Sequence, residues 1–215
     1  MENNYPAPWN LSGKGYILLY KFSKTFAEEQ NYLPEFLQGQ FAGGLGTVML
    51  VDYSTSNAGP YSELLIIPGK FKHRGKKFNT ISKIYVSTMA SVINGKKNWG
   101  IPKELAHFSF KKINTQTEKI SIFSGENTIA EFTLKSGRLP FPVSTKLLPF
   151  PLIQYHEGKY YYTNFYGSGT GKFAKLMDVS INSQFFPDVR GFKPLIAIKV
   201  EPFNITFPPA TIVTP

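Results

Sequence analysis

The stretch IYVSTMASVINGKKNWGIPKELAHF, residues Ile84–Phe108, decides the fold expected for this chain. It begins in a β-rich run and continues into a short helical segment that Ser87 or Thr88 can cap and that Gly95 helps to end. A proline then favours an extended backbone, because its ring fixes φ and restricts the preceding residue. The pattern predicts a strand, a short helix and a second strand that begins near Lys103.

On both sides of this stretch, aromatic and β-branched residues form strand-like runs, with Gly and Pro at the turns between them. Strands are predicted over residues 15–22, 46–53, 63–68 and 80–86, within 106–135, and over 159–167, 172–181 and 194–207, and a short helix over 26–37. No internal repeat or linker divides the chain. We therefore expect a single domain, residues 1–215, that is mainly β with minor α and forms a curled antiparallel sheet or a barrel.

The composition indicates a globular protein of a reducing compartment. Hydrophobic residues make up 42% of the 215 residues, which suffices for a buried core. The absence of cysteine excludes disulfides, thiolate catalysis and cysteine-bound metals. The first residues, MENNYPAPWN, lack the features of a secretory signal, and no apolar run approaches the roughly 18 residues of a membrane span. We expect a cytoplasmic protein that does not enter a membrane.

The net charge of +10 is compatible with a nucleic acid, with small anionic substrates or with solubility alone. The densest basic cluster, GKFKHRGKKF (Gly69–Phe78), lies between two strand-like runs and is expected to be a solvated hairpin loop. Nucleic-acid binding is not expected, because no nucleic-acid-binding motif accompanies the charge.

Two further patterns resemble functional motifs without matching them. YGSGTGKF (Tyr166–Phe173) departs from a phosphate-binding loop at its first and last positions, so a Gly-rich turn between strands is predicted. His73, His107 and His156 are not spaced as metal ligands. No metal and no organic cofactor is expected.

Glu63 stands out because it enters a strand, ELLIIP, that has no polar face. One interpretation places its carboxylate at the mouth of the strand, in water. The other places it inward, where loss of hydration favours the protonated carboxyl and makes Glu63 a candidate acid or base.

Lys103 stands out because Trp99, Ile101 and Leu105 surround it with apolar groups and Pro102 restricts the backbone before it. Apolar surroundings disfavour the ammonium form and leave a nucleophilic amine. Most lysines are nevertheless exposed, so from these residues alone a lysine with its head in water remains an alternative.

Two blocks of the sequence resemble the acetoacetate decarboxylase superfamily. The first is GPYSELLIIP (Gly59–Pro68), where Glu63 matches the family's active-site glutamate, and the second is the opening stretch, where Lys103 matches the family's Schiff-base lysine. GKGYILLYKF, from Gly13, matches more loosely. The resemblance covers roughly residues 13–110 and is only architectural beyond them.

The resemblance implies a cone-like antiparallel β barrel around an apolar cavity, and a homo-oligomer without a cofactor. It implies that Lys103 condenses with the carbonyl of a small or medium oxo acid or ketone, and that the iminium accepts electrons, first of all in decarboxylation. An aldolase, dehydratase or hydratase would use the same iminium. We expect Lys103 and Glu63 to be catalytic, and Lys14, Trp99 and Tyr61 to bind substrate.

The chain departs from the family pattern at two positions. Glu104 replaces a second lysine that directly follows the reactive one, and Lys14 lies where the family has an arginine near the first strand. An alternating extended backbone would turn Glu104 away from Lys103. A non-catalytic β barrel that holds an apolar ligand is the alternative function, and retention of Lys103 and Glu63 favours the enzyme.

Overall fold

The computed structural model describes residues 4–29, 32–146 and 150–215. The α-helices are α1 (Lys24–Glu28) and α2 (Met89–Trp99), and two short 3-10 turns span Glu35–Leu37 and Val189–Gly191. The strands are β1 (Trp9–Tyr20), β2 (Gly46–Thr55), β3 (Tyr61–Ile67), β4 (Lys70–His73), β5 (Lys76–Asn79), β6 (Lys83–Val86), β7 (Lys103–Leu105), β8 (His107–Lys112), β9 (Thr117–Ser124), β10 (Asn127–Ser144), β11 (Pro151–His156), β12 (Lys159–Asn164), β13 (Tyr166–Ile181), β14 (Ile196–Phe207) and β15 (Thr211–Val213).

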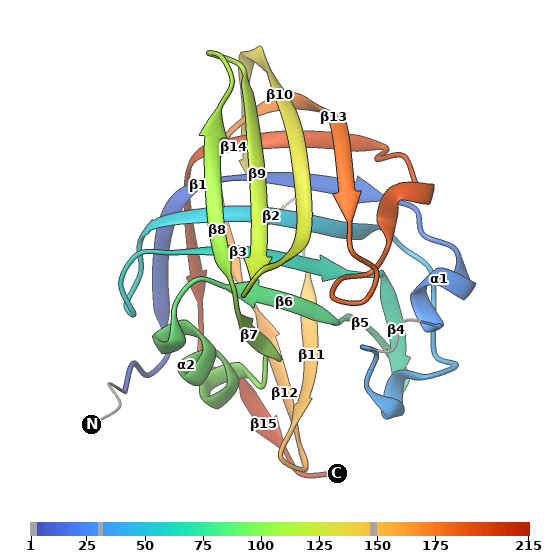
Figure 1. The fold of residues 1–215 in the computed structure, drawn as a ribbon. Coiled ribbons are helices and arrows are strands. Elements are labelled where there is room, and N and C mark those ends of the chain that lie inside the picture. Colours follow the sequence, from blue (N-terminus) through green and yellow to red (C-terminus); the bar gives the residue numbers. More distant parts are fainter. Residues whose placement is uncertain (1–3, 30–31, 147–149) are drawn as a thin grey trace.

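The described strands form two sheets. The large sheet has ten strands in the order β7-β6-β3-β2-β1-β14-β13-β10-β9-β8, and the small sheet has five in the order β15-β12-β11-β5-β4. Figure 1 shows β8, β9 and β10 turned across β1, β2 and β3, so that the large sheet curls into a half-barrel. The expectation of a mainly β, strongly curled and mostly antiparallel sheet is confirmed. Parallel pairing occurs between β6 and β7 and at one bridge between β5 and β11.

The described residues form three hydrophobic clusters, and alternation along the strands of the large sheet separates the two larger ones. On β3, Leu64 and Ile66 enter the first cluster, which fills the curl of the large sheet. Tyr61, Leu65 and Ile67 enter the second cluster, which also contains residues of α2 and the small sheet. All seven residues of β3 are buried, because both faces of this strand are covered. Each such aliphatic side chain contributes roughly 1.5–3 kcal/mol to stability through burial.

Helix α2 forms as expected at its start and differs at its end. The side chain of Thr88 caps the helix by accepting a hydrogen bond from the Ser91 amide. The helix continues through Gly95, so the prediction that Gly95 helps to end it is wrong. Gly100, with φ of 64°, caps the C-terminus, because a left-handed conformation suits glycine.

The Gly-rich segment predicted as a turn is instead the first half of strand β13, and that prediction is wrong. A Cβ at Gly169 would lie 2.9 Å from Cβ of Phe203, and one at Gly171 would lie 2.8 Å from Cγ1 of Val143. A register shift against β14 falls between the same two glycines. Glycine therefore lets neighbouring strands approach closely where the sheet curls.

Two other local predictions have mixed outcomes. The helix predicted over residues 26–37 is wrong in extent: α1 ends at Glu28, residues 30–31 lie outside the described ranges, and only a 3-10 turn follows. The basic segment after Gly69 was expected to be a solvated hairpin loop. It does connect β3 to β6, but it forms two paired strands of its own, β4 and β5, which are joined at Arg74 and Gly75 and bury Phe71.

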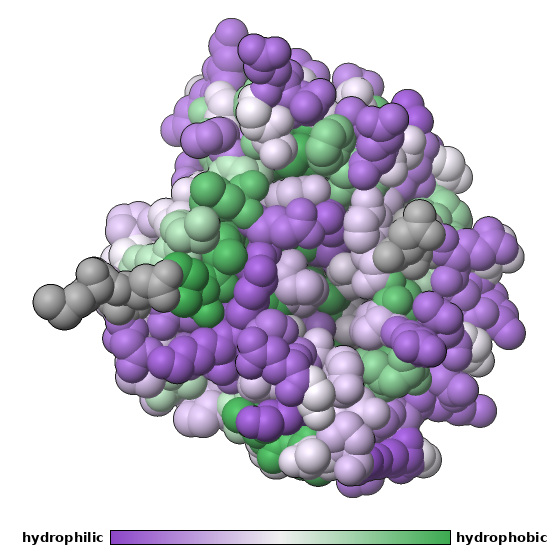
Figure 2. Space-filling model, turned by 60° about the horizontal axis from the view of Figure 1, so that its bottom comes forward, coloured by the Kyte–Doolittle hydropathy of each residue, from purple (hydrophilic) through white to green (hydrophobic). Residues whose placement is uncertain are grey.

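The face near α2 and the small sheet carries mostly polar side chains. Figure 2 shows hydrophilic residues over most of this face, with smaller hydrophobic areas between them. This pattern is typical of a sheet that packs against a core on one side only. None of the helices in the described ranges is long and apolar enough to cross a membrane.

Candidate functional site

Lys103 and Glu63 are brought together by neighbouring strands at one edge of the large sheet. Lys103 is the first residue of β7, which pairs in parallel with β6 so that Lys103 lies opposite Ile84. Glu63 lies on β3, on the other side of β6, opposite Val86. Both side chains are on the face of the sheet that α2 covers.

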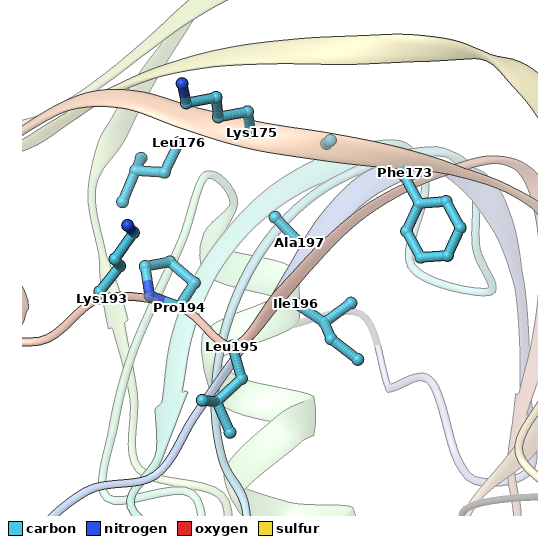
Figure 3. A pocket seen from close by; sticks show the side chains of 9 residues that line it. Phe173, Lys175, Leu176, Lys193, Pro194, Leu195, Ile196 and Ala197 are labelled. Carbon is cyan, nitrogen blue, oxygen red and sulfur yellow. The ribbon is translucent and has the colours of Figure 1, made fainter.

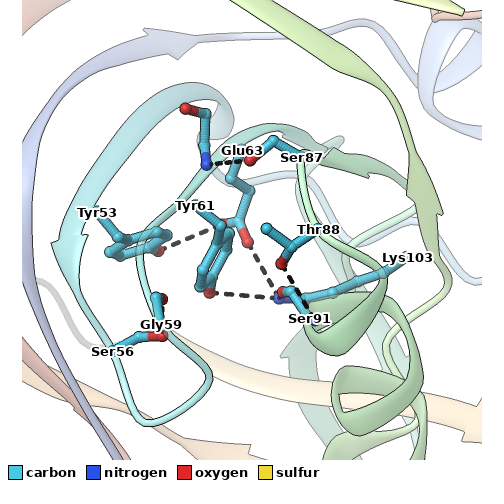
Figure 4. Close-up of polar contacts among 10 residues, drawn as sticks. Tyr53, Ser56, Gly59, Tyr61, Glu63, Ser87, Thr88, Ser91 and Lys103 are labelled. Carbon is cyan, nitrogen blue, oxygen red and sulfur yellow. Dashed lines mark hydrogen bonds and ion pairs between the residues drawn. The ribbon is translucent and has the colours of Figure 1, made fainter. Parts of the chain in front are cut away.

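The amine of Lys103 is held by three side chains (Figure 4). Its Nζ lies 3.2 Å from Oε2 of Glu63, 3.0 Å from Oγ of Ser91 and 3.5 Å from the hydroxyl of Tyr61. Lys103 is only 4% exposed and Glu63 5% exposed. Glu63 therefore points inward rather than into water at the mouth of the strand. Lys103 is likewise buried rather than exposed.

Tyr53 extends this network on the side of the carboxylate. Its hydroxyl donates to Oε1 of Glu63 at 3.3 Å, and its ring packs 4.6 Å from that of Tyr61. Burial, and after it the Glu63 carboxylate, raises the pKa of both tyrosines well above the ordinary value of 10.0. Both hydroxyls therefore stay protonated at neutral pH and can donate to an oxygen.

A small cavity lies at the head of Lys103. Its volume is about 30 Å³, and its lining is Trp9, Leu11, Tyr53, Tyr61, Glu63, Leu65, Ile81, Ile84, Ile101, Lys103 and Phe207. The described lining is thus apolar or aromatic apart from one amine and one carboxylate. Such a setting strengthens electrostatic interactions, because buried apolar surroundings screen charges weakly.

A larger groove of about 260 Å³ lies elsewhere, between β13 and the start of β14. Figure 3 shows Lys175 and Lys193 toward one end of the groove and Phe173 at the other. The groove is open, and its described lining contains neither a carboxylate nor a nucleophile with a base. Chemistry therefore favours the smaller cavity as the site.

Among the predicted substrate-binding residues, Tyr61 alone lies at the amine. Trp99 is buried behind the lining, where its ring meets Trp9 edge-on at 5.1 Å and its Nε1 donates to the Pro208 carbonyl. The Trp9 ring lies 6.0 Å from Nζ of Lys103. Trp9 thus occupies the position beside the amine that the sequence analysis gave to Trp99.

The structure does not bring Lys14 to this site. Lys14 pairs in register with Asp52. Leu11 and Tyr53 lie near Lys14 on β1 and β2, but they belong to the second cluster and project from the opposite face of the sheet. Its amine lies 3.8 Å from Asp52 and 3.9 Å from Glu118. Lys14 therefore belongs to a charged group at the other face.

Glu104 points away from Lys103, as alternation along β7 predicts. Its Oε1 lies 2.6 Å from Nζ of Lys83, whose side chain also approaches the rings of Tyr32 and Tyr85. Lys83 and Ile84 are adjacent on β6 and project to opposite faces. The carboxylate next to Lys103 in sequence thus pairs with Lys83 on the other face of the strand.

Sequence reasoning missed Tyr53, Ser91 and Trp9. Tyr53 faces Tyr61 directly across the β2–β3 hairpin, so the spacing of the two tyrosines around the turn was an available signal. Ser91 lies in the first turn of α2, and only the packing of α2 against β7 reveals its contact. Trp9 comes from a strand far away in the sequence.

The sequence of this chain matches the profile of a known protein family. The sequence profile described as Acetoacetate decarboxylase (ADC) matches residues 3–160. No curated protein sequence matches the chain.

Solved structures share its fold at low sequence identity. An acetoacetate decarboxylase from Legionella pneumophila has 14% identity and a TM-score of 0.70, over 99% of this chain and 90% of that one. An acetoacetate decarboxylase-like enzyme from Sphingomonas wittichii RW1 has 13% identity and a TM-score of 0.67, over 97% and 93%. The enduracididine biosynthesis enzyme MppR, complexed with pyruvate, has 14% identity and a TM-score of 0.64, over 96% and 90%.

The profile covers well over half of the chain, and its matched range includes Glu63 and Lys103. The curled large sheet agrees with the solved structures. The chain belongs to the acetoacetate decarboxylase family.

Proposed function

We propose that this protein is a carbon–carbon lyase that forms an imine between Lys103 and the carbonyl of a small oxo acid or ketone. One observation carries the proposal: the Lys103 amine is buried in an apolar cavity, 3.2 Å from the Glu63 carboxylate. A carboxylate at this distance can take a proton from the ammonium and leave a free amine. Family membership supports the same assignment.

In the proposed imine formation, Glu63 carries a proton from the lysine ammonium to the leaving oxygen. The nitrogen lone pair of Lys103 attacks the carbonyl carbon, and one amine proton passes to the carbonyl oxygen. A second proton, which Glu63 had taken from the ammonium, lets this oxygen leave as water. The product is an iminium with one N–H, and Glu63 is again a carboxylate. The Tyr61 and Ser91 hydroxyls lie close to Nζ, and in this proposal they donate to the departing oxygen.

The iminium then accepts the electron pair of a carbon–carbon bond at the neighbouring carbon. In a 3-oxo acid this bond joins the carbon to the carboxylate, and carbon dioxide leaves; this decarboxylation is the reaction in the family's name. In a β-hydroxy ketone the same bond joins the carbon to a hydroxyl-bearing carbon, and an aldehyde leaves. Either reaction gives an enamine, which is protonated on carbon and released by hydrolysis. For MppR, one complex contains the condensation product of pyruvate and imidazole 4-carboxaldehyde.

The direct test is reductive trapping. The protein is incubated with a panel of oxo acids and ketones, treated with borohydride, and examined by intact mass and peptide mapping. We expect one adduct per chain, located on Lys103, and none in Lys103→Arg. Absence of any adduct across the panel, with normal folding, would favour the alternative in which the cavity only holds an apolar ligand.

A homo-oligomer is also part of the proposal, on the strength of the family resemblance. Light scattering coupled to size-exclusion chromatography measures the mass in solution. A mass near the 24.2 kDa of one chain would contradict it.

A further inference from the structure

The cavity at Lys103 contains one positive and one negative side chain. Among its described lining residues, Lys103 is the sole cation and Glu63 the sole anion. The residues outside the described ranges, at 1–3, 30–31 and 147–149, include no lysine, arginine or histidine in the sequence. The side chains of one chain therefore give this cavity no second cation.

The cations nearest in sequence to the lining residues are engaged elsewhere. Lys83 adjoins the lining residue Ile84 but projects to the other face of β6, where it is paired with Glu104 at 2.6 Å. Lys14 also belongs to the opposite face and contacts Asp52 and Glu118. These lysines already have carboxylate partners, and neither lines the cavity.

This charge balance distinguishes two classes of carbonyl compound. Once an iminium has formed, it carries the single positive charge of the site, and Glu63 offsets that charge. A substrate carboxylate would add a second negative charge in the same apolar space, with no cation of its own. An unpaired charge in such surroundings is costly, and two carboxylates in close proximity repel each other. An uncharged aldehyde or ketone leaves the balance unchanged.

We propose that the substrate at this site is an uncharged aldehyde or ketone rather than an oxo acid. This inference rests on the proposed imine chemistry and narrows its substrate class. The carbon–carbon cleavage that suits such a substrate is that of a β-hydroxy ketone, and Glu63 can both accept and return the proton that it requires. The Glu63 carboxylate takes the hydroxyl proton, the carbon–carbon electrons flow into the iminium, and an aldehyde and an enamine result. Glu63 then returns the proton to the enamine carbon, and water releases the product ketone from Lys103.

The test compares pairs of compounds that differ mainly in a carboxylate. 2-Pentanone is compared with 4-oxopentanoate, and acetone with pyruvate, each at equal concentration, by borohydride trapping and intact mass. We expect the uncharged member of each pair to label Lys103 at least about tenfold more than the oxo acid at equilibrium, as repulsion between nearby like charges predicts. Lys103→Arg provides the baseline for labelling elsewhere.

A second arm tests the physical cause. Glu63→Gln removes the negative charge of the cavity and keeps the shape of the side chain. The ratio of oxo-acid to ketone labelling is expected to rise about tenfold in this variant, although labelling is slower overall. The ratio is measured at equilibrium, so the slower rate does not enter it.

The outcomes separate the two proposals. Preferential or equal labelling by oxo acids on Lys103 would overturn the substrate class and leave the imine chemistry standing. An unchanged ratio in a folded Glu63→Gln variant would overturn the electrostatic argument. No labelling of Lys103 by any compound would overturn the proposed function itself. If Glu63→Gln does not fold, the wild-type ratio decides alone.

Discussion

The aliphatic stem of Lys103 crosses helix α2 at Gly95, where a Cβ would lie 2.6 Å from Cδ and 2.9 Å from Cε of the lysine. The absence of a side chain at this one helical position lets the amine reach Glu63. Glycine in a helix interior costs about 1 kcal/mol relative to alanine. The helix thus gives up some intrinsic stability at the point where Lys103 passes.

Gly95→Ala is expected to separate stability from reactivity. The added methyl group displaces a lysine side chain rather than backbone, so the fold remains. The helix gains up to about 1 kcal/mol in propensity, which opposes the cost of leaving the buried Glu63 carboxylate without its partner. The rate of borohydride-trapped adduct formation is expected to fall at least about tenfold, because the amine leaves Glu63. Thermal unfolding and adduct formation are measured on the same samples. Lys96→Ala, one residue along the helix, is the matched control and should change neither; equal reactivity of Gly95→Ala and wild type would contradict the prediction.

Lys103→Arg is expected to abolish imine formation while preserving the positive charge. The guanidinium stays protonated and offers no nucleophilic lone pair. Because it can still pair with Glu63, the circular dichroism spectrum should match that of the wild type. Trapping of wild type at another lysine, or adduct formation by the variant at the wild-type rate, would be incompatible with the assigned nucleophile.

Glu63→Gln is expected to slow adduct formation on the order of a hundredfold, because it removes the proposed proton carrier. The Tyr53 hydroxyl, 3.3 Å from Glu63, can still donate to the amide oxygen, so the tyrosine network keeps a partner. Stopped reactions with an excess of ketone give the rate. A folded variant with an unchanged rate would remove Glu63 from the mechanism.

Glu104→Gln is expected not to change the pH dependence of adduct formation. Its carboxylate is half exposed and contacts Lys83 on the far side of β7, so it does not act on the Lys103 amine. Stability should fall by about 1 kcal/mol or less, as for other partly exposed ion pairs. Adduct formation is followed across a pH series, with the exposed Glu126→Gln as the control. A displacement of the profile by about one pH unit would show that Glu104 and Lys103 interact.

Glu118 is expected to make the fold sensitive to acid. Burial alone would raise its pKa, but hydrogen bonds from Tyr16 and Lys199, together with the charges of Lys199 and Lys14, lower it below the ordinary value of 4.5. The folded state therefore stabilises the ionised carboxylate of Glu118 more than the unfolded state does. This contribution to the stability of the fold is fully present when the pH is above the ordinary pKa of 4.5. It is lost as the pH falls through the lowered pKa that Glu118 has in the folded state.

The unfolding midpoints of wild type and Glu118→Gln should therefore differ most near neutral pH. Their difference should narrow as the pH falls from about 6 to about 3. Thermal melts over this range, with Glu126→Gln as the control, measure it. A difference that is constant with pH would mean that Glu118 acts only through shape or neutral hydrogen bonding.

Alternation predicted the strands and, through them, part of the site. The run from Tyr61 to Ile67 has apolar residues on both sides, so a carboxylate within it had to be buried or at an end of the strand. The short segment after the helix predicted Lys103 near a strand start. These two patterns are local in the sequence. They predicted part of the site correctly because β3, β6 and β7 lie side by side in the large sheet.

The remaining features depend on contacts between segments distant in sequence. Lys14 was expected at the site because of its place in the chain, but the pairing of β1 with β2 turns it toward Asp52. The composition of the glycine-rich segment after Tyr166 is typical of a turn. In the structure, glycine is needed there because neighbouring strands pack too closely for a side chain. Ser91 and Trp9 reach Lys103 only after α2 and β1 have packed against the same face.

The cavity of about 30 Å³ has a kinetic consequence. It has room for a water molecule but not for a ketone. Access to Lys103 therefore requires transient opening of the cavity, whose walls come from the edge of the large sheet and the segments packed over it. If the proposed imine chemistry holds, we expect the frequency of that opening, and not diffusion, to limit the reaction when ketone is abundant. The observed rate of imine formation should then level off at high ketone concentration, at a value common to ketones of similar size.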